Sequence, residues 1–292
     1  MALAFYRFLS AGLFSAEARE MSLLHFLFYI RSGRGLDIMV ATSGGAQEMR
    51  IAGGSHRISE RLAEELGDAV HLRSPVHAIV QHDDGVTVIH ERGAVAARHA
   101  IVTLPPALAG RLRYSPPLPS TRDALTQQMP MGSVIKIQVA YDAPFWREDG
   151  LSGFAISFDD ELSITFDNSP LDGSCGVMLG FFEGAHARSV AALPTEARRE
   201  QAIETLTALF GPKAAEVVEY VERDWMAEEY TRGCYGGRLG AGVWTQYGHA
   251  LTPPVGRIHW AGAETSDVWN GYMDGAVRSG RRAAGEVLAA LR

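Results

Sequence analysis

The sequence of 292 residues has few cysteines and no long apolar run. Cys175 and Cys234 are too few for a disulfide framework, so we expect a reducing compartment and predict a cytoplasmic protein. The richest apolar stretch near the start, residues 23–30, is far shorter than the roughly 20 residues that cross a membrane, so no membrane span is expected. No basic cluster precedes the N-terminal apolar run, which argues against a secretory signal.

Several motifs that carry chemistry are also missing. Histidines are scattered without an H-E-x-x-H motif or paired cysteine ligands, so no metal site is predicted. Neither a G-x-S-x-G nucleophile elbow nor a Walker A loop occurs. The net charge of −7 and the lack of a basic stripe with interleaved aromatics argue against nucleic-acid binding.

The residues that are present fit a folded α+β protein of about two domains. Apolar residues make up 47% and charged residues 21%, the proportions of a globular chain that buries a core. Period-two patterns and β-branched runs predict strands at residues 36–41, 70–72, 76–81, 86–90, 100–103, 134–139, 151–158, 162–166, 177–182 and 257–261. Helical spacing and end signals predict helices within residues 3–30 and at residues 56–66, 195–210 and about 271–291.

The last of these strands and the last helix form a βα unit joined by a loop at residues 262–270. The helix contains Gly271, Gly275 and Gly280, each of which lowers helix propensity by roughly 1 kcal/mol against alanine. Small residues there suit a group that packs closely on the first turns. A helix N-terminus also favours an anion or an electron-rich carbonyl. A close contact between helix and sheet explains the pattern equally well.

Several long motifs resemble the flavin-containing monoamine oxidase family. They are GGS at 53–55, MGSVIK at 131–136, PFWR at 144–147, EYTRGCY at 229–235, TQYG at 245–248, PVGRIHWAGAET at 254–265 and WNGYMDGA at 269–276. The resemblance implies the two-domain α+β fold of an FAD-dependent amine oxidase. On that pattern, residues 1–52 and 125–228 would form the substrate domain, and residues 53–124 and 229–292 the FAD-binding domain.

One element of that family is not found in the sequence. Members begin with a βαβ unit that carries G-x-G-x-x-G for the cofactor's pyrophosphate, and no such loop occurs here. The sequence therefore resembles roughly the C-terminal two-thirds of an amine oxidase. Three explanations fit this pattern: the sequence is a fragment, its start is misplaced, or it is one half of a split enzyme. A homodimer and a partner chain that supplies the N-terminal segment are also open.

The resemblance assigns roles to residues that spacing alone leaves ordinary. Lys136, in a strand, would hold a water against flavin N5, whereas its pattern alone indicates a surface lysine. Tyr235 and Tyr272 would face each other and guide the amine to the flavin, although either alone could be a core tyrosine. Cys234 matches the cysteine that binds the flavin 8α-methyl in the animal enzymes, so a covalent FAD is open.

Further positions are implied around the substrate and the cofactor. Gln47 matches a glutamine of the substrate cavity, and Val76 matches a position whose backbone contacts the adenine. The residues expected against the flavin ring or its ribityl chain are Trp225, Glu264, Thr265, Trp269 and Met273. Trp225 is equally well explained as a packed core tryptophan.

The implied activity is FAD-dependent oxidative deamination of a primary amine. The imine would hydrolyse to an aldehyde, and O2 would be reduced to H2O2. An amino-acid or polyamine oxidase on the same scaffold is an alternative, with Arg238 as the candidate clamp for a carboxylate. A non-catalytic truncated remnant, or one subunit of a split enzyme, is the alternative of another class.

Overall fold

The computed structural model describes residues 2–157 and 160–292, and the chain folds into two compact units. Unit 1 comprises Met1–Ser22 and Met129–Ala241, and unit 2 comprises Leu23–Gln128 and Gly242–Arg292. These boundaries follow compactness, whereas the predicted domains were drawn by function, so the domain assignment stays a prediction. No helix in the described part of the chain is both long and apolar enough to cross a membrane.

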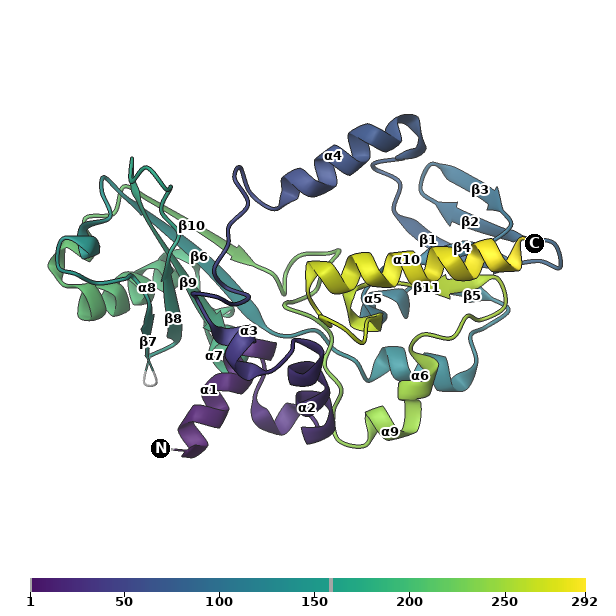
Figure 1. Cartoon of the computed structure of the whole chain (residues 1–292), viewed down its shortest axis with the longest axis horizontal. Helices are drawn as coiled ribbons and strands as arrows, with labels where there is room; N and C mark the ends of the chain where they lie inside the picture. The colour runs from purple at the N-terminus through teal and green to yellow at the C-terminus, as the bar shows by residue number, and fades with distance from the viewer. Residues whose placement is uncertain (1, 158–159) are drawn as a thin grey trace. The chain divides into compact units, whose positions relative to one another are not determined.

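Unit 1 is built on a five-stranded antiparallel sheet in the order β10-β6-β9-β8-β7 (Figure 1). The strands are β6 (Val134–Tyr141), β7 (Ala155–Ile156), β8 (Leu162–Asp167), β9 (Gly176–Glu183) and β10 (Glu219–Asp224). The helices are α1 (Ala2–Phe14), α7 (Gly184–Val190) and α8 (Thr195–Phe210), with short 3-10 turns η1 (Ala18–Glu20), η3 (Phe145–Arg147) and η4 (Pro212–Ala215).

The core of unit 1 lies on one face of this sheet. Ile135, Ile137 and Val139 of β6 are fully buried and share a cluster with Leu206 and Phe210 of α8. Because side chains alternate along a strand, Lys136 and its neighbours at even positions lie on the opposite face. The two faces of β6 are those that period-two alternation over residues 134–139 predicts.

Unit 2 contains a four-stranded sheet and a separate pair of strands. The sheet has the order β3-β2-β1-β5, with β1 (Val76–Gln81), β2 (Val86–His90), β3 (Gly93–Ala97) and β5 (Arg113–Ser115). The pair is β4 (Ala100–Val102) parallel to β11 (Ile258–Trp260), and its buried side chains share a core cluster with Ile79 and Val86. The helices of unit 2 are α2 (Leu23–Ser32), α3 (Leu36–Val40), α4 (His56–Leu66), α5 (Pro106–Ala109), α6 (Ser120–Gln127), α9 (Val243–Tyr247) and α10 (Met273–Ala290), with 3-10 turns η2 (Gly67–Ala69), η5 (Gly248–Ala250) and η6 (Ala263–Thr265).

Two predicted strands are wrong. The strand expected at residues 36–41 is instead helix α3 over residues 36–40, which begins directly after Gly35 and buries only Met39. A pattern of five residues is too short to separate helix from strand. Residues 70–72 are not in a strand of the described part of the chain, and Leu72 is 73% exposed. The prediction rested on composition, which does not by itself make a segment pair with a neighbouring strand.

A third prediction is too long, and two short strands were not predicted. The strand expected at residues 151–158 pairs only at Ala155–Ile156, because Gly153 takes a left-handed φ of 74°; residue 158 lies outside the described residues. Strands β3 and β5 were not predicted because neither shows an alternation of apolar and polar residues. Every residue of β3 is exposed, and β5 has only three residues.

Candidate functional site

Lys136 lies in a ring of aromatic side chains in unit 1. Its Nζ is 5.0 Å from the ring centroid of Tyr235, 5.5 Å from that of Phe181 and 5.9 Å from that of Trp225. Phe181 is the direct cross-strand partner of Lys136 on β9, and Trp225 directly follows β10. A cation over aromatic faces is attracted by their quadrupoles, so the ammonium and the rings hold one another in place.

Tyr235 reaches this ring of side chains from a loop that is fixed to the start of β6. The backbone N–H of Cys234 donates to the carbonyl of Gly132 at 3.0 Å. A Cβ on Gly132 would lie 2.0 Å from the carbonyl oxygen of Cys234, so only glycine permits this approach. The glycine in the MGSVIK motif therefore brings Tyr235 and Lys136 together.

The hydroxyl of Tyr235 donates to a buried carboxylate that the sequence analysis did not identify. Its acceptor is Glu183 Oε1 at 2.9 Å, and Ser163 donates to Oε2 of the same carboxyl at 3.4 Å. Burial raises the pKa of Glu183 to about 7, against the opposing effects of the two hydrogen bonds and of Lys136. In the sequence, Glu183 could have been identified as the single acidic residue at the end of an apolar strand.

Two further predicted residues border the same ring of side chains. Trp225 Nε1 is buried and has no hydrogen-bond acceptor among the described residues. Cys234 is a free thiol of intermediate exposure, and burial raises its pKa while the charge of Lys136 opposes the rise. A bound group that accepts a hydrogen bond would satisfy the buried donor of Trp225.

Glu183 also lines a cavity of about 610 Å³ within unit 1. Charged groups of both signs share this cavity, including Arg7, Arg19, Glu17 and Asp160. The carboxyl of Glu183 thus contacts Tyr235 with one oxygen and belongs to the wall of a hollow.

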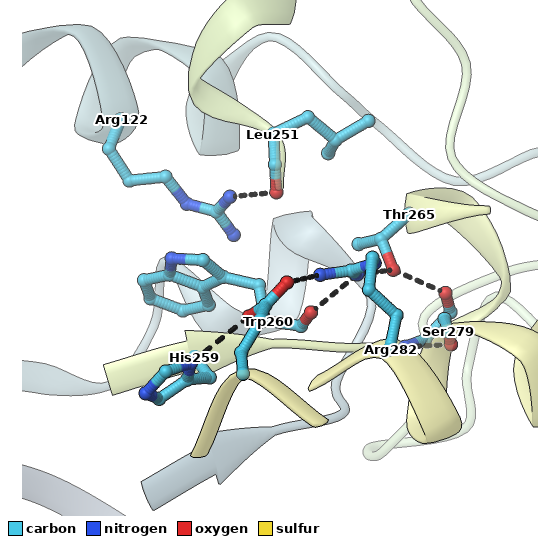
Figure 2. Close-up of polar contacts among 9 residues, drawn as sticks. Arg122, Leu251, His259, Trp260, Thr265, Ser279 and Arg282 are labelled. Atoms are coloured by element: carbon cyan, nitrogen blue, oxygen red, sulfur yellow. Dashed lines mark hydrogen bonds and ion pairs between the residues drawn. The ribbon is translucent and has the colours of Figure 1, made fainter. Parts of the chain in front are cut away.

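The corner from β11 to α10 in unit 2 is held by buried polar contacts. Figure 2 shows Arg282 of α10 at its centre. Nη2 of Arg282 donates to the carbonyl of Trp260 at 2.8 Å and to Thr265 Oγ1 at 3.0 Å, and Nη1 pairs with Glu286 at 2.6 Å. The N–H of Gly262 donates to Ser279 Oγ at 3.0 Å. The corner is therefore a fixed element.

Arg122 contacts Trp260 of the same strand. Its guanidinium lies 3.7 Å from the ring centroid of Trp260 and donates to the carbonyl of Leu251 at 2.6 Å (Figure 2). It also donates to the carbonyl of Ala250 at 2.9 Å. Burial lowers the pKa of Arg122 to about 10, and nearby Tyr114 partly offsets this. Arg122 therefore has a structural role and stabilises the position of β11.

The loop after η6 carries the other predicted aromatic residues. Glu264 and Thr265 are buried, and the side chain of Asn270 donates to the carbonyls of Glu264 and Ser266 at 3.0 and 2.8 Å. The ring centroid of Tyr272 lies 5.1 Å from that of Trp269 and 6.2 Å from that of Tyr29 in α2. Met273 begins α10 and is half exposed.

Gln47 and Val76 lie elsewhere in unit 2. Gln47 Nε2 donates to the carbonyl of Met39 in α3 at 3.1 Å, and Val76 opens β1 opposite His90. Within unit 1 the structure groups Lys136, Trp225, Cys234 and Tyr235; within unit 2 it groups Glu264, Thr265, Trp269, Tyr272 and Met273. Each group is described within its own unit, and the roles of these residues stay predictions.

Comparison with known proteins supplies the family. Residues 2–288 match the family of flavin-containing amine oxidoreductases. The chain belongs to this family. It is 42% identical over 275 residues to the probable flavin-containing monoamine oxidase A of Dictyostelium discoideum, covering 94% of this chain and 60% of that protein. It is 41% identical over 283 residues to flavin-containing amine oxidase B of Sus scrofa, covering 95% of this chain and 54% of that protein.

Solved structures of amine oxidases share the fold of this family member. A putrescine oxidase bound to putrescine superposes with a TM-score of 0.94 at 33% identity, covering 98% of this chain and 64% of that one. Cyclohexylamine oxidase from Brevibacterium oxydans gives a TM-score of 0.92 at 31% identity, covering 99% and 64%. The family resemblance and the α+β fold are confirmed. The chain spans less than two thirds of the length of each of these relatives.

The residues around Lys136 in this member of the amine oxidase family fit the ring of a flavin. Trp225 Nε1 is a buried donor that lacks an acceptor, next to Lys136 and the aromatic side chains around it. A flavin ring is flat and carries carbonyl and ring-nitrogen acceptors, which suit such surroundings. The 292 residues contain no G-x-G-x-x-G loop, so the fit applies to the ring and not to the pyrophosphate.

Proposed function

We propose that this chain carries the amine-binding machinery of an FAD-dependent amine oxidase that acts on a primary amine with O2. The observation that carries the proposal is the set of three aromatic rings around Lys136 in a member of the amine oxidase family. When bound, the flavin accepts two electrons and a hydrogen from the α-carbon of the amine and passes them to O2.

The side chains would perform the binding steps. Tyr235 and Tyr272 would offer electron-rich ring faces to the nitrogen of the amine, and Lys136 would hold a water near the ring that receives the hydrogen. Trp225, Cys234, Glu264, Thr265, Trp269 and Met273 would hold the cofactor, with Val76 at its adenine and Gln47 at the substrate.

The alternative of an amino-acid oxidase receives less support. It needs a cation for the substrate carboxylate, and Arg238 was the candidate. Arg238 is buried, donates to the carbonyl of Met131 and pairs with Glu20 at 3.6 Å. Its guanidinium is thus already engaged within unit 1. We propose a primary amine as substrate, with polyamines as the second class to test.

The phosphates of the cofactor need a binding loop that these residues do not supply. We propose that residues other than these 292, on the same polypeptide or on a partner chain, hold them. A homodimer is the other assembly to test. Light scattering on the purified protein, alone and with candidate partners, measures the assembly directly.

The test is amine-dependent peroxide formation by the purified protein, combined with the residues or the partner chain that bind the phosphates and supplied with FAD. We expect a visible flavin absorbance band and peroxide with benzylamine or putrescine but not with leucine. Lys136→Met should lower the rate on the order of 100-fold, because it removes a charge beside the reacting centre. The matched control is Lys213→Met, since Lys213 pairs with Glu148 at an exposed site of the same unit. No flavin band and no peroxide with any amine would contradict the proposal.

A further inference from the structure

Glu183 is a buried acid whose surroundings are unusually constrained. It is the last residue of β9 and is 1% exposed. The next residue, Gly184, has a left-handed φ of 58°, and the N–H of Ala185 donates to Glu17 at 3.1 Å. Gly184 also donates its N–H to the carbonyl of Ser133 at 2.9 Å. The backbone that carries this carboxyl is therefore fixed on both sides.

Tyr235 is held at two points, and Glu183 is one of them. The phenol oxygen donates to Glu183 Oε1 at 2.9 Å, while the ring face lies 5.0 Å from Lys136 Nζ. The first contact fixes the end of the ring, and the second fixes its face. A ring held in this way has one orientation available, which is what recognition of a small amine against a ring face requires.

We propose that Glu183 is a positioning residue that orients the ring of Tyr235 for the amine. The inference rests on the proposed function, because Tyr235 has a substrate only if the chain binds an amine. Glu183 acts through the phenol and does not itself contact the amine.

The chemistry of the pair favours this role. The hydrogen bond to Glu183 Oε1 satisfies a phenol O–H that is buried, and an unpaired polar group in such a place is costly. If the acceptor is removed, the phenol loses its partner in a buried place, and the ring is free to tilt. An amide in place of the carboxyl keeps an acceptor oxygen, so Glu183→Gln should preserve the geometry, whereas Glu183→Met fills similar space without an acceptor.

The first readout is the ring itself and needs neither flavin nor amine. We would place 3-fluorotyrosine at position 235 and record its ¹⁹F NMR signal in the purified chain. Glu183→Gln should keep a single narrow signal near that of the unchanged protein. Glu183→Met should shift or broaden it. Ser163→Ala, which removes the bonds of that hydroxyl to the other carboxyl oxygen and to the carbonyl of Phe181 but keeps the bond between Tyr235 and Glu183, should change it little. An unchanged signal in Glu183→Met would overturn the inference.

The second readout is the kinetic constants for benzylamine. Glu183→Met should raise KM about tenfold with a smaller change in kcat, because a misplaced ring weakens amine binding. Glu183→Gln should stay within about threefold of the unchanged protein. In a Tyr235→Phe background, Glu183→Met should add nothing further, since the bond is already gone.

The outcomes separate the two proposals. If Glu183→Gln harms KM as much as Glu183→Met does, the charge and not the acceptor is what matters, and the positioning role is wrong. If additive effects appear in Tyr235→Phe, Glu183 acts elsewhere and the role is also wrong. If no amine is oxidised at all, the proposed function fails, and the ¹⁹F signal alone decides whether Glu183 orients Tyr235.

Discussion

At the scale of single residues, the chain places one acid where ionisation is costly. Glu183 is buried in unit 1, and burial raises its pKa from 4.5 to about 7, although Tyr235, Ser163 and Lys136 each oppose the rise. The folded state therefore binds this proton more tightly than the unfolded state does. Its contribution to stability is fully present below pH 4.5 and is lost as the pH rises to about 7.

Replacing Glu183 by glutamine should remove this loss. A rise in pKa from 4.5 to about 7 corresponds to about 3 kcal/mol of unfolding free energy. We expect the stability of Glu183→Gln relative to the unchanged protein to increase by up to about 3 kcal/mol between about pH 4.5 and about pH 8. Urea unfolding at several pH values measures it, with Glu161→Gln, directly before the neighbouring strand β8, as the control. A difference that does not change with pH would contradict the assignment.

The residues of the site were predictable to different degrees. Lys136 was assigned to its face of the strand by period-two alternation, and the surrounding burial agrees. Glu183 was not predicted as a partner of Tyr235, because 52 positions separate them and the contact exists only through the sheet and the loop at Gly132. Pairing of this kind depends on tertiary structure, which a single sequence does not encode locally.

At the scale of elements, the glycines of α10 separate into two kinds. A Cβ on Gly275 would lie 2.1 Å from the carbonyl oxygen of Trp269, whereas one on Gly285 would meet nothing within 4 Å. Gly275 is buried and Gly285 is exposed in the same helix. Only the first glycine is needed for packing.

Alanine at these two positions should therefore have opposite effects. Gly285→Ala should stabilise the chain by about 0.5 to 1 kcal/mol, because alanine has the higher helix propensity. Gly275→Ala should destabilise it by about 2 kcal/mol or more, because the loop that carries Trp269 must shift. Thermal unfolding of both variants measures the contrast. Equal effects would show that the first turn of α10 is not closely packed.

The elements themselves were predicted best where the pattern was long. The helix at residues 195–210 agrees with α8 at both ends, because Gly211 and Pro212 stop it. Helix α3 was predicted as a strand because its only signals are the glycine before it and one buried methionine. The strand β5 was missed because it gains its place by pairing in parallel with β1, a contact between distant residues.

At the scale of the whole molecule, the two units carry buried groups that respond to pH in opposite directions. His25 of α2 is 1% exposed, and burial lowers its pKa from 6.5 to about 4. The folded state of unit 2 therefore disfavours the protonated ring. This contribution to stability is present above pH 6.5 and is lost as the pH falls toward 4.

Acidification should therefore weaken unit 2 through His25. We expect a loss of about 2 kcal/mol by about pH 5, which His25→Phe should abolish. Hydrogen exchange followed by mass spectrometry separates the units, because peptides of residues 23–128 report on unit 2 and those of residues 129–241 on unit 1. Protection of unit 2 that is unchanged in acid would contradict the prediction for His25.

The route of the chain through its units has a consequence for making the protein. Unit 1 takes residues from Met1–Ser22 and again from Met129–Ala241, so the ribosome delivers its first part long before the rest. Helix α1 is therefore synthesised before the sheet of unit 1, and more than a hundred residues of unit 2 are translated between them. Neither unit corresponds to one continuous segment of the sequence, so a gene for either unit alone must join two separate segments.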